Sequence, residues 1–167
     1  MATLPQLIEE DIRRLDETLR EFVAQADATV ALLIDKGGFV LTHQGAAGEL
    51  DLTTIGALSS GAYLASQTIA GLVNEKDFNH TSQQGEHASL FTMNVDEHCL
   101  LVVIFPSQTG LGIVKYYAAG AVRRLALQLA VARDRDPGGG FDLSAMNVTD
   151  PQELFRKKAV GPTGGKK

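Results

Sequence analysis

The sequence contains no tryptophan and only one cysteine among its 167 residues. A single cysteine can form neither a disulfide within the chain nor a cysteine-rich zinc site. Cys99 lies inside the apolar run HCLLVVIF, so we expect it to be a small core residue. The beginning, MATLPQLIEEDIRRL, lacks the hydrophobic stretch of a secretory signal. These features predict a cytoplasmic protein without a disulfide framework.

Positive charge is also scarce, since 15 Lys and Arg residues stand against 20 Asp and Glu residues, for a formal net charge of −5 at pH 7. This balance argues against the basic footprint of a nucleic-acid-binding surface. The paired arginines at 13–14 and 123–124 have acidic or apolar neighbours. We therefore expect them on solvated helix faces, and we expect no nucleic acid among the partners.

Motifs for nucleotide binding and catalysis are absent as well. No G-x-x-x-x-G-K-[ST] occurs, which excludes a P-loop. Gly110 and Gly112 lack the third glycine of a dinucleotide-binding fingerprint, so a tight turn is the better interpretation. The serines before Gly61 lack the G-x-S-x-G frame of a nucleophile elbow. We therefore expect no catalytic residue and no cofactor.

The four histidines, at positions 43, 80, 87 and 98, are scattered over predicted strand ends and turns. No two of them have the i, i+4 spacing that places a pair of imidazoles on one side of a helix. Surface positions are the interpretation that we favour, and no metal site is expected.

Charge is missing altogether from residues 52–74, LTTIGALSSGAYLASQTIAGLVN. An ordinary surface helix buries one stripe and carries charge on its other side. Apolar residues recur here at steps of three and four, which predicts a helix, with Asp51 as its N-cap. The predicted core stripe of this helix is Ile55, Leu58, Ala62, Ala65, Ile69 and Leu72.

A second side of the same helix carries mostly small residues, which let another backbone come close. The predicted platform for a second protein surface consists of Ala57, Ser60, Gly61, Leu64, Thr68 and Gly71. A membrane span is the alternative, since the length is suitable. The polar content of the helix, together with Asp51 and Glu75 at its ends, argues against insertion.

Hydrophobic periodicity predicts three helices and five strands along the chain. In order, they are helix 7–26, strands 29–34 and 39–43, helix 52–74, strands 78–84, 90–95 and 98–105, and helix 113–133. The order α-β-β-α-β-β-β-α predicts an α/β (α+β) fold, in which a five-stranded, mainly antiparallel sheet carries helices on both faces.

Composition changes after the last helix. We predict a domain over residues 1–133, a flexible linker over 134–140 (DRDPGGG), a tail with a short helix over 141–158 and a disordered end over 159–167. Capping signals at Asp150 and Glu153 start the short helix. Leu154 and Phe155 are its predicted anchors, either on a partner or on the domain itself.

A series of short motifs follows a characteristic order along residues 7–129. The motifs are Leu33-Ile34-Asp35 with Lys36–Gly38 and Val40-Leu41, then Asp51, Thr54, Leu58 and Gly61, then Glu75, Phe78, Gly85 and Glu86, and finally LLVVIF followed by GLGIVK at 110–115. Together they resemble the Roadblock / dynein light chain family and, within it, the bacterial MglB-type proteins.

The resemblance implies a homodimer whose third strands pair into one continuous sheet, with Phe78, His80 and Ser82 on the predicted dimer edge strand. It also implies one small Ras-like GTPase of the MglA type, in its GTP form, bound on the uncharged helices. Proteins of this type are GTPase-activating proteins of bacterial polarity and motility, not enzymes. They rearrange the GTPase's own catalytic residues, and in some of them the tail promotes nucleotide exchange.

The arginine positions agree with that implication. None of the eight arginines lies in the predicted platform helix, so no arginine finger is available there. Two other functions stay open. One is a Roadblock scaffold that binds a GTPase without activating it. The other is a small-ligand sensor or enzyme on a profilin-like or PAS-like sheet, for which the sequence offers no polar pocket constellation.

Overall fold

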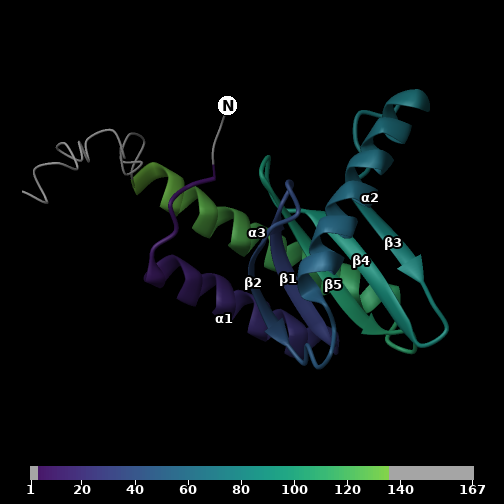
Figure 1. The fold of residues 1–167 in the computed structure, drawn as a ribbon, viewed down its shortest axis with the longest axis horizontal. Coiled ribbons are helices and arrows are strands. Elements are labelled where there is room, and N and C mark those ends of the chain that lie inside the picture. Colours follow the sequence, from purple (N-terminus) through teal and green to yellow (C-terminus); the bar gives the residue numbers. More distant parts are fainter. Residues whose placement is uncertain (1–3, 136–167) are drawn as a thin grey trace, which may run out of the picture. The chain divides into compact units, whose positions relative to one another are not determined.

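The structure, a computed structural model, describes residues 4–135. Its elements are α1 (Glu9–Ala26), β1 (Val30–Asp35), β2 (Val40–Gly45), α2 (Leu52–Leu72), β3 (His80–Gln84), β4 (Ala88–Asn94), β5 (Cys99–Pro106) and α3 (Leu111–Arg135). This order confirms the predicted fold class (Figure 1). The predicted tail over 141–158, with Leu154 and Phe155, and the end over 159–167 lie outside the described residues.

The five strands form one sheet in the order β2-β1-β5-β4-β3, and every neighbouring pair is antiparallel. The central strands β1 and β5 are buried along nearly their whole length, because they carry apolar side chains on both faces. The polar strand β3 is one edge of the sheet, as its composition predicts.

Helices cover both faces of the sheet, with α1 and α3 on one face and α2 on the other (Figure 1). The larger core lies under α1 and α3 and includes Leu15, Leu19, Phe22, Phe91, Phe105, Leu125 and Leu129. The smaller core, under α2, includes Val30, Leu32, Ile34, Tyr63, Leu100 and Val102. The chain therefore builds most of its apolar interior on the α1–α3 side.

The turn between β1 and β2 fixes how closely α2 approaches the sheet. Gly38 has a φ of +94°, and a Cβ added there would lie 2.8 Å from the Cα of Ala57. On α2, a Cβ added to Gly56 would lie 3.2 Å from the carbonyl oxygen of Gly38. Two glycines that face each other thus let the helix backbone pack directly on the turn.

The last helix continues past its predicted end at residue 133. Arg135 donates from two guanidinium nitrogens to the carboxylate of Asp11, at 2.7 and 2.8 Å. This ion pair holds the end of α3 against α1, so Asp134 and Arg135 belong to the helix and not to the predicted linker. Within residues 4–135, no helix has the length and apolarity needed to cross a membrane.

Candidate functional site

α2 begins at the cap that the sequence predicts. The carboxylate of Asp51 accepts the backbone N–H of Thr54 at 3.1 Å and its hydroxyl at 2.5 Å. These hydrogen bonds lower the pKa of Asp51, first through the hydroxyl and then through the backbone N–H. From this cap to Leu72, the helix carries no charged residue.

The side of α2 that faces the sheet differs from the predicted one. The buried residues are Gly56, Ser59, Ser60, Tyr63 and Ala70. Of the predicted core stripe, Ile55 is half-buried, whereas Leu58, Ala62, Ala65, Ile69 and Leu72 are exposed. The predicted core stripe was therefore wrong, because it ranked side chains by hydrophobicity and ignored the partners available to the polar ones.

Hydrogen bonds to the backbone hold the polar side of α2 against the sheet. The hydroxyl of Ser60 donates to the carbonyl oxygen of Lys36 at 2.5 Å. The side-chain N–H of Gln67 donates to the carbonyl oxygen of Phe78 at 2.9 Å. The side-chain oxygen of Gln67 accepts a hydrogen bond from the backbone N–H of Phe78 at 3.0 Å. Polar groups that find such partners can be buried at little cost.

The outward side of α2 is apolar and exposed. Leu58 is 68% exposed and Leu72 is 79% exposed. We define the α2 face as the exposed residues Ala57, Leu58, Gly61, Leu64, Thr68, Ile69, Gly71 and Leu72. Of the predicted platform, only Ser60 is buried, and it therefore drops out. Contiguous apolar surface of this kind is typical of protein–protein contacts.

Within residues 4–135, the edge strand β3 pairs only with β4, which leaves its other side open. The strand begins at His80, and Phe78 precedes it, contrary to the prediction. The ring of His80 lies 5.3 Å from that of Phe91, and burial lowers the pKa of this histidine. Ser82 is paired with Phe91 in the register. These side chains face the α3 side, so pairing along this edge would use the backbone.

A cavity of about 440 Å³ opens between α2 and the turn that joins β4 to β5. Its lining combines polar side chains, such as Lys36, Gln67 and Glu97, with apolar ones, such as Leu64 and Met93. No three His, Cys, Asp or Glu side chains gather as a metal site requires within the part of the chain that the structure describes.

The other side chains that could take part in chemistry are the thiol of Cys99 and the imidazoles of the histidines. Cys99 is completely buried, and this burial raises the pKa of its thiol to about 12, which keeps it unreactive at neutral pH. His43 and His87 are exposed, as expected. The side chain of His98 is only 15% exposed, so the prediction of a surface histidine was wrong there.

Comparison with known sequences gives one domain match. The family model for the Roadblock/LC7 domain matches residues 14–105, which span α1 to β5. No curated protein matches the chain.

Solved structures of MglB are similar over most of the chain. The gliding protein MglB of Thermus thermophilus has 33% identity and a TM-score of 0.72, and the match covers 78% of this chain and 99% of that one. MglB with tetrameric arrangement has 32% identity and a TM-score of 0.73, with 79% and 99% covered. MglB of Myxococcus xanthus has 27% identity and a TM-score of 0.70, with 76% and 96% covered.

Proposed function

Because this chain belongs to the Roadblock/LC7 family, we propose that it forms a homodimer and regulates a small Ras-like GTPase of the MglA type. The observation that carries the proposal is the α2 face, which is apolar, free of charge and exposed. A helix of this composition needs a protein surface against it, and the similarity to MglB supports a GTPase of the MglA type as the owner of that surface.

In the proposed homodimer, β3 of one chain pairs with β3 of its copy along the open edge of the sheet. The backbone N–H and C=O groups of an edge strand are a template for such pairing. The two α2 helices then lie on the same face of the joined sheet, and part of each α2 face is buried. A stable interface of this kind covers roughly 800 Å² per partner.

The remainder of the two α2 faces forms the platform for one GTPase in its GTP form. All described arginines lie on α1 or α3, so α2 offers no arginine finger. We propose that the contact instead repositions the GTPase's own catalytic residues, since correct positioning alone contributes strongly to phosphoryl transfer. The chain itself then acts as a GTPase-activating protein in the cytoplasm and takes no part in the chemistry.

The tail over residues 141–158 is the second element of the proposal. We assign Leu154 and Phe155 as anchors on the GTPase, where the tail promotes nucleotide exchange. A short capped helix that orders only on contact binds reversibly, because ordering costs conformational entropy.

Single-turnover hydrolysis of GTP by an MglA-type GTPase tests the proposal. Adding this chain is expected to raise the rate at least tenfold, which corresponds to about 1.4 kcal/mol of activation free energy. An unchanged rate within a stable complex would identify a scaffold that binds without activating. Absence of both binding and stimulation would contradict the proposal.

A further inference from the structure

The outward side of α3 carries a second exposed apolar stripe. Its large members, Ile113, Tyr116, Leu127 and Val131, are between 50% and 75% exposed, and Gly120 lies between them. We call these five residues the α3 stripe. Steps of three, four and seven residues separate them, so they lie along one side of the helix. Exposed apolar side chains grouped in this way are typical of a contact with another protein.

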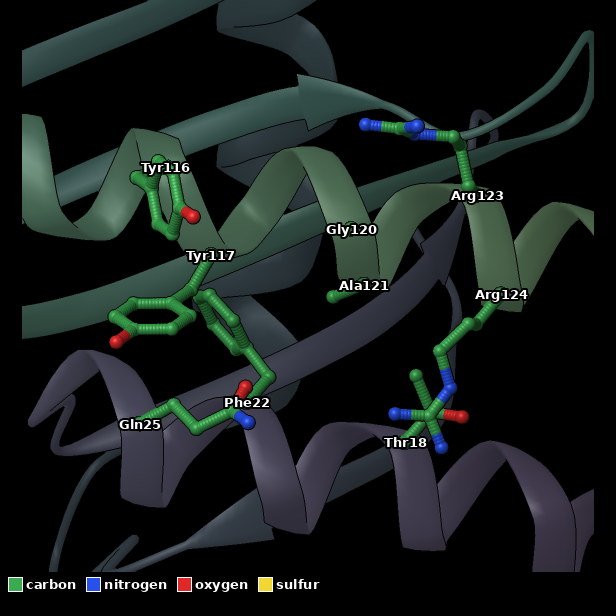
Figure 2. A pocket seen from close by; sticks show the side chains of 9 residues that line it. All are labelled: Thr18, Phe22, Gln25, Tyr116, Tyr117, Gly120, Ala121, Arg123 and Arg124. Atoms are coloured by element: carbon green, nitrogen blue, oxygen red, sulfur yellow. The ribbon is translucent and has the colours of Figure 1, made fainter.

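A groove runs beside the α3 stripe, between α3 and α1, with a volume of about 300 Å³. Figure 2 shows Tyr117 from α3 and Phe22 from α1 along it, with Gly120 at a point where α3 offers no side chain. A Cβ added at Gly120 would meet no atom within 4 Å, so this point is open. The rings of Tyr116 and Tyr117 meet edge to face with centroids 5.1 Å apart, which holds Tyr116 beside the groove. The groove is therefore a recess with aromatic walls that can receive an apolar side chain of a partner.

The charge along α3 has one sign. From residue 111 to residue 133 every charged side chain is basic, although the whole chain has a net charge of −5. These side chains are Lys115, Arg123, Arg124 and Arg133. Arg124 is paired with Glu21 of α1, whereas Arg123, among the described residues, donates only to the carbonyl oxygen of Ala119 in its own helix. Figure 2 shows Arg124 directed toward α1 and Arg123 on the side of α3 away from α1.

The acidic residues of α1 next to the groove do not compensate Arg123. Glu21 is paired with Arg124, and Glu17 is paired with Arg13. Since Arg123 is exposed and lines the groove, a carboxylate brought by a partner could pair with it. The chemistry that complements this surface is therefore an apolar side chain for the recess and an acidic side chain for Arg123.

Charge and shape also select the kind of occupant. A second copy of the chain fits poorly, because an antiparallel crossing at the middle of α3 brings Arg123 and Arg124 of both copies together, and like charges oppose the contact. An anionic membrane would attract these arginines. A planar bilayer surface does not enter a recess between two helices, however, so the shape of the groove favours a protein side chain.

From these observations we infer that the α3 stripe binds an acidic amphipathic helix of another protein. The stripe is about 27 Å long from Ile113 to Val131, which suits a partner helix with apolar side chains at steps of three and four. One of these side chains enters the recess at Gly120, and a neighbouring carboxylate pairs with Arg123. The α3 stripe and the α2 face lie on opposite faces of the sheet (Figure 1), so the inference stands independently of the proposed function.

Selection of random peptides, displayed on phage, against the full chain tests the inference. With peptides about 20 residues long, matching the α3 stripe, the enriched sequences are expected to carry Asp or Glu beside apolar residues at helical spacing. Synthetic copies should bind Arg123→Glu and Leu127→Glu roughly tenfold more weakly than wild type. Replacing the acidic residues of the peptide by lysine should restore binding to Arg123→Glu.

Arg20→Glu is the matched control, because Arg20 is exposed on α1 outside the groove and the substitution changes the net charge equally. Equal binding of the peptides to Arg123→Glu and Arg20→Glu would overturn the inference. Enriched peptides without acidic residues would overturn it as well.

Further measurements identify the other possible occupants. Binding of wild type to phosphatidylglycerol vesicles that is lost in Arg123→Glu would assign the groove to a membrane. If Leu127→Glu sediments with fewer subunits than wild type, the α3 stripe is a contact between copies. Peptide binding that appears only after truncation behind Asp136 would assign the groove to the chain's own tail. Each of these results would overturn the inference.

The GTPase is the last occupant to separate. Arg123→Glu is expected to stimulate GTP hydrolysis as wild type does, since the α2 face is unchanged. Loss of stimulation in Arg123→Glu would place the GTPase on α3 and overturn the inference of a second partner. If wild type does not stimulate the GTPase but binds the acidic peptides through Arg123, the proposed function fails and the inference stands.

Discussion

Two polar side chains, Ser60 and Gln67, orient α2 on the sheet. Each forms a hydrogen bond with a backbone group in place of water. The leucines on the other side of the helix therefore stay exposed to solvent. A hydrogen bond of this kind contributes about 1 kcal/mol, while a buried group without a partner costs more. The polar side chains therefore determine which apolar surface becomes available for binding.

Gln67→Ala is expected to destabilise the fold by about 2 kcal/mol, because the N–H of Phe78 loses its partner and the carbonyl oxygen of Phe78 keeps only the 3.5 Å hydrogen bond from the Tyr63 hydroxyl. Hydrogen exchange of residues 78–84 should accelerate, since this contact fixes the segment that leads into β3. Thr68→Ala is the neighbouring control, because among the described residues the Thr68 hydroxyl donates only to the carbonyl oxygen of Leu64 in its own helix. Equal exchange rates in the two variants would rule out this role for Gln67.

Asp11 joins the start of α1 to the end of α3. Its buried carboxylate accepts hydrogen bonds from Arg135, the Ile8 N–H and Gln128. The Arg135 bond is the main reason why the pKa of Asp11 falls from its ordinary 3.8 to about 2. Because the folded pKa lies below the unfolded one, this stabilisation is present above pH ~4 and is lost as the pH falls toward ~2.

Asp11→Asn is expected to lower the free energy of unfolding at neutral pH by about 2 kcal/mol, since it removes a charge-assisted bond to Arg135. Denaturant titration at several pH values should also show that the free energy of unfolding of Asp11→Asn declines less steeply between pH ~4 and ~2 than that of wild type. Glu10→Gln is the control. Arg13 and Arg14 also lower the pKa of Glu10, but this carboxylate is solvent-exposed, so the change should have little effect on stability. If the free energy of unfolding of Asp11→Asn fell as steeply with acid as that of wild type, the role of Asp11 would be contradicted.

At the scale of elements, local periodicity predicted the order of helices and strands. The amphipathic pattern of α1 places Leu15, Leu19 and Phe22 in the core, because charged residues mark its other side. In α2 that contrast is missing, so hydrophobic spacing could not identify the buried side. The deciding contact, from Ser60 to Lys36, joins residues that lie far apart in the sequence.

The ends of elements were less predictable, for a similar reason. The strand β3 starts only at His80, because Gln67 occupies both backbone groups of Phe78. Likewise α3 reaches Arg135 because its guanidinium finds the Asp11 carboxylate across the α1–α3 contact. Both outcomes depend on tertiary partners that a window of neighbouring residues does not contain.

The proposed tail can be tested by truncation after Asp136, which keeps every described residue. The truncated chain is expected to retain the melting temperature of the full chain, while its effect on nucleotide exchange by the GTPase declines. Leu154→Ala with Phe155→Ala in the full chain should reproduce that decline. A drop of several degrees in melting temperature would mean that the tail packs on its own domain.

At the scale of the whole molecule, the two faces of the sheet have different roles. The α1–α3 side holds most of the buried apolar residues and stabilises the fold. The α2 side buries few large side chains and exposes Leu58, Leu64 and Leu72. The α1–α3 side therefore stabilises the fold, and we propose that the α2 side recognises the GTPase.

GTP hydrolysis with Gly61→Arg tests whether the α2 face receives the GTPase. A Cβ at Gly61 meets no atom within 4 Å, so the fold should persist. Ala57 is less suitable, since it packs against Gly38. An arginine on the α2 face must lose water against neutral residues. Gly112→Arg, equally open but on α3, is the control.

We expect Gly61→Arg to melt like the Gly112→Arg control. We also expect it to stimulate single-turnover GTP hydrolysis at least tenfold less than wild type does, with a matching loss of complex formation. Stimulation by Gly61→Arg equal to that by wild type would rule out the α2 face and place the GTPase contact on another surface.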